Sequence, residues 1–253
     1  MESLAEPCEL LPWDSKFFGF PVARVLGDIL TTDHSDAIER WCEEREIQCL
    51  YFLARSDDAG TVALAEARGF HLVDVRMTLE QAVSDAPRSG TAKPASGIRG
   101  AEIDDLPELR RIARLSHTDT RFFFDGRFLR ERCESLYETW IQSSFEGFAQ
   151  AVFVSEVKGR IAGYVTCHLS KEGDEGSIGL IAVDAPHQGK GLGRQLVAAA
   201  MEWFTSQNVH PVSVVTQGRN IAAQRLYART GFIPRTLELY YHCWLLRTDK
   251  DRR

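Results

Sequence analysis

The segment Gln188–Gly193 (Q-G-K-G-L-G) carries the clearest chemical signal in this 253-residue chain. Before it, Ser177 to Val183 (S-I-G-L-I-A-V) is typical of a buried strand, and after it apolar residues recur at helical spacing from Leu192 to Phe204. Glycines at a strand-to-helix junction let consecutive backbone N–H groups converge without interference from Cβ atoms. The positive end of the helix dipole would lie behind those groups. The segment therefore predicts a site for a phosphate-bearing ligand.

Two common phosphate-binding patterns do not fit this segment. The Walker pattern fails because no Ser or Thr follows a suitable Gly-Lys, and the dinucleotide pattern G-x-G-x-x-G fails because its third glycine would fall on Arg194. The pattern that fits is Q-x-x-G-x-G, with Gln188, Gly191 and Gly193. The ligand is therefore not expected to be bound in either of those two ways.

This pattern resembles the coenzyme A loop of the GCN5-related N-acetyltransferase (GNAT) superfamily. Val183 to Gln188 reproduces the usual V-x-x-x-x-Q approach to the loop. Downstream, the family's second signature, N-x-x-A-x-x-L-Y-x-x-x-G-F, is matched in order by Asn220, Ala223, Leu226, Tyr227 and Gly231-Phe232. The resemblance implies an α/β GNAT fold with a mixed, mostly antiparallel sheet flanked by helices. It also implies acetyl-CoA as the co-substrate.

The resemblance assigns roles to particular residues. The strand ending at Val183 would splay from its neighbour and offer main-chain groups to the pantetheine arm, and an amide near Leu180 or Ile181 would polarise the thioester carbonyl. Asn220 would contact the coenzyme, although its position also suits a helix N-cap, and both roles can hold. The expected coenzyme-binding residues are Leu180, Ile181, Val183, Gln188, Gly189, Lys190, Gly191, Leu192, Gly193, Arg194 and Asn220.

Tyr227 is the expected catalytic residue. A phenol is protonated at neutral pH and can donate to the departing thiolate, a role we favour over that of a core tyrosine beside Leu226. For the base that accepts the amine proton, the spacing of His168, Glu175 and Asp184 singles out none, and a water relay is equally open. No cysteine lies in the motif, so direct attack of the amine is expected rather than an acetyl-enzyme.

Short matches elsewhere resemble the dTDP-fucosamine acetyltransferase family, which implies a 4-amino sugar on a dTDP carrier as the acceptor; a UDP carrier stays open. The matching segments are Leu11–Gly19, Gly69–Val73, Trp140-Ile141 and Val215–Gln217. Residues 117–125, where acceptor contacts are expected, match only loosely. There, Arg121 could bind a diphosphate bidentately, or the segment could be a short amphipathic helix that packs its phenylalanines inward. The alternatives are a GNAT enzyme for another small amine or a protein N-terminus, and a coenzyme A-binding module without turnover.

The chain divides at a segment rich in small residues, Pro and Gly. Residues 82–97 read as a linker between an N-terminal α/β lobe, 1–81, and an acetyltransferase domain, 98–253. The lobe shows a β-α-β-α-β order that matches residues 177–245 but has no glycine loop. A degenerate half-copy of the domain and a coincidence of α/β alternation both remain open.

Composition restricts the function classes. A net charge of −6 argues against nucleic-acid and membrane binding, and no apolar run approaches the roughly 20 residues that span a bilayer. The first residues lack the apolar core of a secretory signal, and six scattered cysteines are typical of reduced thiols, so we expect a cytoplasmic protein. No metal-ligand spacing is present, so no metal is expected. The aromatic final strand after Leu237 could pair across a homodimer or complete the sheet of one chain.

Overall fold

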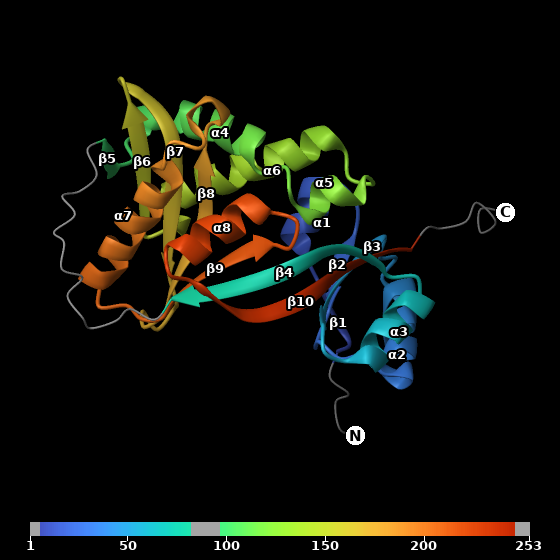
Figure 1. Cartoon of the computed structure of the whole chain (residues 1–253). Helices are drawn as coiled ribbons and strands as arrows, with labels where there is room; N and C mark the ends of the chain where they lie inside the picture. The colour runs from blue at the N-terminus through green and yellow to red at the C-terminus, as the bar shows by residue number, and fades with distance from the viewer. Residues whose placement is uncertain (1–5, 82–96, 246–253) are drawn as a thin grey trace. The chain divides into compact units, whose positions relative to one another are not determined.

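The computed structural model describes residues 6–81 and 97–245 (Figure 1). The predicted linker, 82–97, lies outside these residues except for Gly97. In chain order the elements are β1 (Cys8–Leu10), α1 (Pro12–Phe18), β2 (Val22–Val25), α2 (Thr32–Glu44), β3 (Cys49–Arg55), α3 (Ala59–Ala67), β4 (His71–Gln81), β5 (Ile98–Gly100), η1 (Ile103–Asp105), α4 (Leu106–Ser116), α5 (Arg121–Asp125), α6 (Arg130–Ser143), η2 (Ser144–Phe148), β6 (Ala151–Val157), β7 (Arg160–Leu169), β8 (Gly176–Val183), η3 (Ala185–His187), α7 (Leu192–Ser206), β9 (Val212–Gln217), α8 (Ile221–Arg229) and β10 (Ile233–Trp244).

The described residues form two compact units. Unit 1 comprises residues 6–76, 121–128 and 237–245, and unit 2 comprises residues 77–81, 97–120 and 129–236. The predicted domains 1–81 and 98–253 stay a prediction. No helix within the described ranges combines the length and apolarity needed to cross a bilayer.

Unit 2 is built on a mostly antiparallel sheet with strand order β4-β9-β8-β7-β6-β5, and this confirms the expected α/β class. From β5 to β9 the neighbouring strands pair antiparallel, except that β8 and β9 run parallel. Side chains alternate between the two faces of a strand. On β7, Val165 and Cys167 pack into the apolar cluster with helix α7. Tyr164 and Thr166 therefore point to the opposite face, where α4 contacts β7 (Figure 1).

Two irregularities in β8 shape this sheet. First, Val165 is paired with Ile181 but Cys167 with Ile178, so two residues of β8 stand opposite Thr166 alone, which is a β-bulge. Second, β8 and β9 pair only from Gly176 to Ile178 on the β8 side, although both strands continue beyond that point. The parallel pair therefore parts toward its carboxyl ends.

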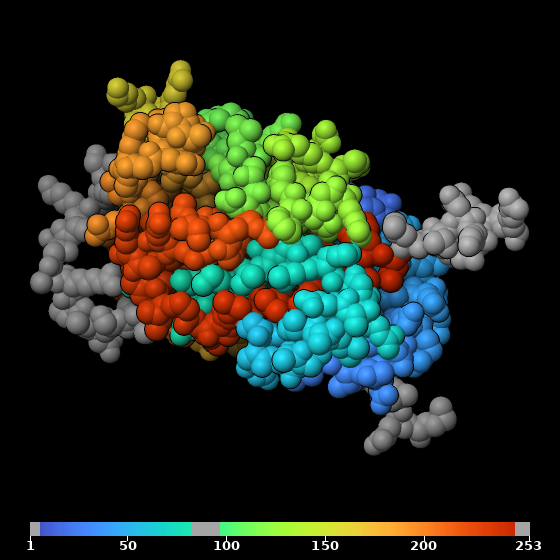
Figure 2. Space-filling view, turned by 45° about the vertical axis from the view of Figure 1, so that its right-hand side comes forward, coloured from blue at the N-terminus to red at the C-terminus, as the bar shows by residue number. Residues whose placement is uncertain are grey.

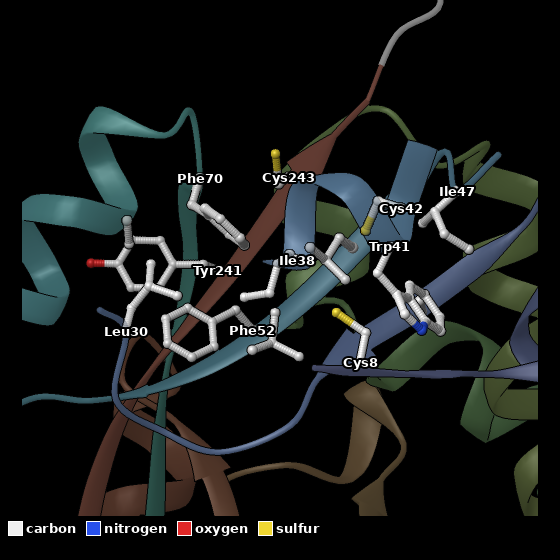
Figure 3. Packing of buried hydrophobic residues seen from close by; sticks show 14 of the residues in the cluster. Cys8, Leu30, Ile38, Trp41, Cys42, Ile47, Phe52, Phe70, Tyr241 and Cys243 are labelled. Atoms are coloured by element: carbon white, nitrogen blue, oxygen red, sulfur yellow. The ribbon is translucent and has the colours of Figure 1, made fainter. Parts of the chain in front are cut away.

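Unit 1 has its own sheet and core. β2 and β3 run parallel, and β10 pairs antiparallel with β3 from Glu238 to Trp244. The aromatic final strand thus completes a sheet of its own chain, one of the two arrangements that the sequence left open. Figure 3 shows the apolar core, in which Ile38 and Trp41 of α2 pack with Phe52 of β3. The thiols of Cys8, Cys42 and Cys243 are part of the same core.

Each half of the chain repeats one order of elements. A parallel strand pair, β2/β3 or β8/β9, is linked by α2 or α7, and a second helix leads to a third strand. Each third strand lies beside the parallel pair of the other half of the chain: β10, from the second half, lies beside β3, and β4, from the first half, lies beside β9. This order is compatible with the half-copy hypothesis, which stays a hypothesis.

Candidate functional site

A cavity of about 1000 Å³ opens in unit 2 where β8 and β9 part. Its walls include Gly179 to Val183 of β8, Val215 to Gln217 of β9 and the start of α7. Helices α7 and α8 adjoin on the face seen in Figure 2, in orange and orange-red. Of the predicted site residues, all line this cavity except Lys190 and Arg121.

The glycine loop is shaped for an anion. Gly189 and Gly191 have φ of 74° and 83°, in the left-handed region that favours glycine, and Gly191 is the N-cap of α7. A Cβ on Gly193 would lie 3.2 Å from Leu226, so the close packing of α7 on α8 restricts this position. The first N–H groups of α7 have no intrahelical acceptors and can bind a pyrophosphate.

Side chains of the loop brace its backbone. Gln188 Nε2 donates to the Val183 carbonyl (2.9 Å), and Lys190 Nζ donates to the Pro186 carbonyl (2.7 Å). The side chain of Lys190 therefore supports the loop. Three cations also line the cavity, Arg194, Arg225 and Arg229, and their charge favours a polyanionic coenzyme.

One of the two amides that were expected to polarise the thioester, that of Leu180, lies in the bulge of β8 and is bound by the side chain of Thr166. Leu180 N–H donates to Thr166 Oγ1 at 2.8 Å, and Thr166 Oγ1 lies 3.0 Å from His168 Nε2. A Cβ on Gly179 would come within 2.4 Å of His168 Nε2, so a larger residue there would require the His168 ring to move. The sequence did not predict this support, because nothing in the spacing of Thr166 indicates that its partner is a bulged amide.

Tyr227 lies on α8 with 2% of its surface exposed, and its ring packs against that of Phe232 at an interplanar angle of 59°. Burial raises the pKa of its phenol above the ordinary value, so the hydroxyl is protonated at neutral pH. The described residues provide no hydrogen bond to this hydroxyl, although the residue lines the cavity. Its proton is therefore available to a ligand. Asn220 caps α8 by accepting from Ala223 N–H (3.0 Å) and lines the same cavity, so both of its expected roles remain compatible.

The three residues considered as bases lie outside the cavity wall. Asp184 forms a 2.7 Å ion pair with Arg111, and Glu175 lies in an exposed turn after β7. Burial lowers the pKa of His168, and the carbonyl of Phe148 partly opposes that shift. These positions favour structural roles over proton transfer.

Two residues that the sequence did not single out, His117 and Thr120, line the cavity at the end of α4. His117 Nε2 lies 2.8 Å from Tyr164 Oη, and its ring stacks on Tyr137 with centroids 4.7 Å apart. Thr120 is 6% exposed, and its hydroxyl has no hydrogen-bond partner within the described part of the chain. The only sequence-based indication of a role for His117 and Thr120 was the expectation that residues 117–125 contain acceptor contacts.

Arg121, the predicted substrate contact, belongs to unit 1. Its guanidinium lies over the rings of Tyr51 and Tyr240, 4.1 and 4.3 Å from their centroids, and donates to His242 Nε2 (2.7 Å). His242 in turn donates through Nδ1 to Asp125. The segment forms a short helix, α5, with Phe122 buried, as the packing alternative predicted, although Phe124 is 58% exposed. Binding of a diphosphate by Arg121 stays a prediction.

A cavity that joins phosphate-binding amides to an available phenol suits transfer of an acyl group from a phosphate-bearing thioester. Residues 109–232 match the model of the Acetyltransferase (GNAT) family. Residues 109–232 therefore form a domain of the GNAT type.

Two curated proteins show the range of similarity. The spore coat polysaccharide biosynthesis protein SpsD of Bacillus subtilis is 32% identical over 143 residues, 56% of this chain, and the match spans 49% of SpsD. The chain thus covers about half the length of that relative. The dTDP-fucosamine acetyltransferase of Escherichia coli is 25% identical over 229 residues, 88% of this chain and 92% of the relative.

A mycothiol acetyltransferase of Mycobacterium avium is 28% identical over 192 residues, 71% of this chain and 59% of the relative. Among solved structures, a GCN5-related N-acetyltransferase from Sphaerobacter thermophilus superposes with a TM-score of 0.66 at 16% identity, over 95% of this chain and 76% of the other. This likeness concerns the fold. The described residues contain no cluster of three or more His, Cys, Asp or Glu side chains that could hold a metal ion.

Proposed function

We propose that the protein moves an acetyl group from acetyl-CoA to the amine of a nucleotide-linked amino sugar by direct attack. The observation that carries this proposal is the single cavity that contains the glycine loop, Tyr227 and the end of α4. Similarity to dTDP-fucosamine acetyltransferase over most of the chain supports a sugar acceptor.

The loop amides and Asn220 hold the coenzyme so that the thioester lies along β8. The acceptor nitrogen attacks the thioester carbon, a C–N bond forms, and the carbonyl electron pair moves to oxygen. The carbonyl re-forms as the C–S bond breaks, Tyr227 donates its proton to the sulfur, and the proton lost by the acceptor nitrogen passes through water back to the Tyr227 oxygen. Holding both substrates together supplies much of the acceleration.

The composition of the cavity wall agrees with direct attack. No cysteine is among the lining residues, and all six cysteines are buried. A covalent acetyl-cysteine would therefore need a rearrangement of the wall. Tyr137 and Trp140 of α6, with ring centroids 5.1 Å apart, add an aromatic surface against which the apolar face of a pyranose can pack. A cytoplasmic location is part of the proposal, since acetyl-CoA and nucleotide sugars are cytoplasmic substrates.

The test is a panel of dTDP- and UDP-linked amino sugars incubated with the purified chain and acetyl-CoA, with release of the free thiol as the signal. We expect turnover of at least one sugar nucleotide and a fall in kcat of about 100-fold for Tyr227→Phe, with the KM for acetyl-CoA unchanged. Acetylation of enzyme protein without acceptor, seen by intact mass, would contradict direct attack. Preference for a small thiol-bearing amine or for a peptide N-terminus over every sugar nucleotide would refute the acceptor class.

A small amine acceptor of the mycothiol type is the second candidate, because mycothiol acetyltransferases match 71% of this chain. The same panel decides between them when the amine precursor of mycothiol is included.

A further inference from the structure

His117 lies where three elements of unit 2 meet. It is the residue that follows α4, its ring stacks on Tyr137 of α6 with an interplanar angle of 19°, and its Nε2 contacts Tyr164 of β7. Tyr164 is opposite Ala182 of β8, one register step from Ile181. His117 is thus fixed beside the part of β8 that lines the cavity, on the face of the sheet opposite the α7 cluster.

The protonation state of this pair follows from its surroundings. Burial lowers the pKa of His117 to about 4, so the imidazole is neutral at physiological pH. Burial also raises the pKa of Tyr164 well above its ordinary value, so the phenol keeps its proton. Tyr164 is 0% exposed, and within the described ranges His117 Nε2 is the hydrogen-bond partner of its hydroxyl.

The direction of the hydrogen bond then decides the tautomer. If Nε2–H donated to Tyr164, the buried phenol proton would have no acceptor, which is unfavourable. The phenol therefore donates to Nε2, and the proton of the neutral imidazole is on Nδ1. No other hydrogen bond of His117 is found among residues 6–81 and 97–245. Because His117 lines the cavity, Nδ1–H is a neutral donor available to a ligand there.

Thr120 supplies the second polar group. Thr120 lines the same cavity three residues after His117, and its buried hydroxyl has no hydrogen-bond partner among the described residues. A buried hydroxyl without a partner is uncommon, and a ligand oxygen would satisfy it. Both groups are uncharged, and Tyr137 and Trp140 line the same cavity.

We propose that His117 and Thr120 form the acceptor-recognition site: His117 Nδ1–H donates to one oxygen of the acceptor, and the Thr120 hydroxyl pairs with a second. Two neutral hydrogen-bonding groups beside aromatic rings suit a hydroxyl-bearing pyranose better than a peptide chain or a simple alkylamine. The inference rests on the proposed function and deepens it, because it assigns the choice of acceptor to two residues.

The first experiment compares variants with dTDP-4-amino-4,6-dideoxygalactose as the acceptor. We expect His117→Phe, which keeps a ring to stack on Tyr137, and Thr120→Val each to raise the acceptor KM about 10-fold. The KM for acetyl-CoA should stay within 2-fold of wild type. Thr118→Val is the matched control, because Thr118 is exposed two residues before Thr120 and is not part of the cavity wall.

The second experiment pairs each variant with the 2-deoxy and 3-deoxy analogues of that sugar nucleotide. If a side chain bonds a given hydroxyl, deleting either partner should cost about the same factor, and deleting both should cost little more. His117→Asn, which restores an N–H donor, should recover part of the loss, whereas a proton-accepting role would not be recovered.

The outcomes separate the two proposals. Strictly additive losses for every pair, or a fall in kcat with unchanged acceptor KM for His117→Phe, would overturn the recognition site while acetyl transfer stands. Equal efficiency with butylamine and with the sugar nucleotide would do the same. A wild-type enzyme that acetylates no member of the panel would refute the proposed function and, with it, this inference.

Discussion

Replacing Thr166 by valine tests whether its hydroxyl holds the bulge of β8. Valine keeps the shape of the side chain but removes both hydrogen bonds, the 2.8 Å bond from Leu180 N–H and the 3.0 Å contact with His168 Nε2. Thr166 is 0% exposed, so water cannot readily replace it. An amide left without an acceptor costs about 1–3 kcal/mol, and the lost contact with His168 adds about 1 kcal/mol. We therefore expect the free energy of unfolding to fall by about 2–4 kcal/mol.

Urea unfolding followed by circular dichroism measures this loss, and amide hydrogen exchange shows whether Leu180 N–H becomes less protected. Thr166→Ser is the matched control: it keeps the hydroxyl and should lose only about 1 kcal/mol for the missing methyl group. A Thr166→Val protein within about 0.5 kcal/mol of wild type, with Leu180 still protected, would show that the backbone holds the bulge without the hydroxyl.

Three further predictions concern the ion pair, the loop and the buried histidine. Asp184→Asn removes the ion pair with Arg111, whose side chain is 41% exposed, so we expect stability to fall by no more than about 1 kcal/mol and kcat to change less than 3-fold; a 100-fold loss of kcat would make Asp184 the base. Gly191→Ala places a Cβ at a φ of 83°, which costs about 1–2 kcal/mol and should weaken acetyl-CoA binding in calorimetry; unchanged affinity would mean that this backbone shape is not needed. Because the pKa of His117 is about 4 when folded and about 6.5 when unfolded, the unfolded chain binds more protons between these values, so stability should fall as pH drops from 6.5 to 4. Thermal melts of His117→Gln should show a smaller drop, and an identical pH profile would contradict a neutral His117.

Much of the architecture could be predicted because local patterns and tertiary structure agree. The strand expected over 177–183 is β8, Gly176–Val183, and the helical spacing from Leu192 to Phe204 belongs to α7, Leu192–Ser206. By contrast, Leu11–Gly19 was identified only as a matching segment, and most of it is helix α1, Pro12–Phe18, which begins with proline.

The site residues were likewise predicted where the signal was local in the sequence and missed where it was not. Glycine spacing and the Asn220–Tyr227 interval are local features of the sequence, and these residues do line one cavity. The partners of Leu180 and His117 are Thr166 and Tyr164, which lie 14 and 47 residues away. Such pairs depend on strand register and on the approach of α4 to β7, neither of which a single sequence encodes locally. The acceptor side of the cavity was therefore the part that needed the structure.

The exchange of third strands has a consequence for how this protein can be divided. A fragment ending at residue 81 would keep β3 but lose β10, and a fragment starting at residue 97 would keep β9 but lose β4. Each would expose an unpaired strand edge with apolar side chains, a surface prone to aggregation. The fragment starting at residue 97 is therefore not expected to fold as an independent domain. It should become soluble when both fragments are produced together, because each then supplies the strand that the other lacks.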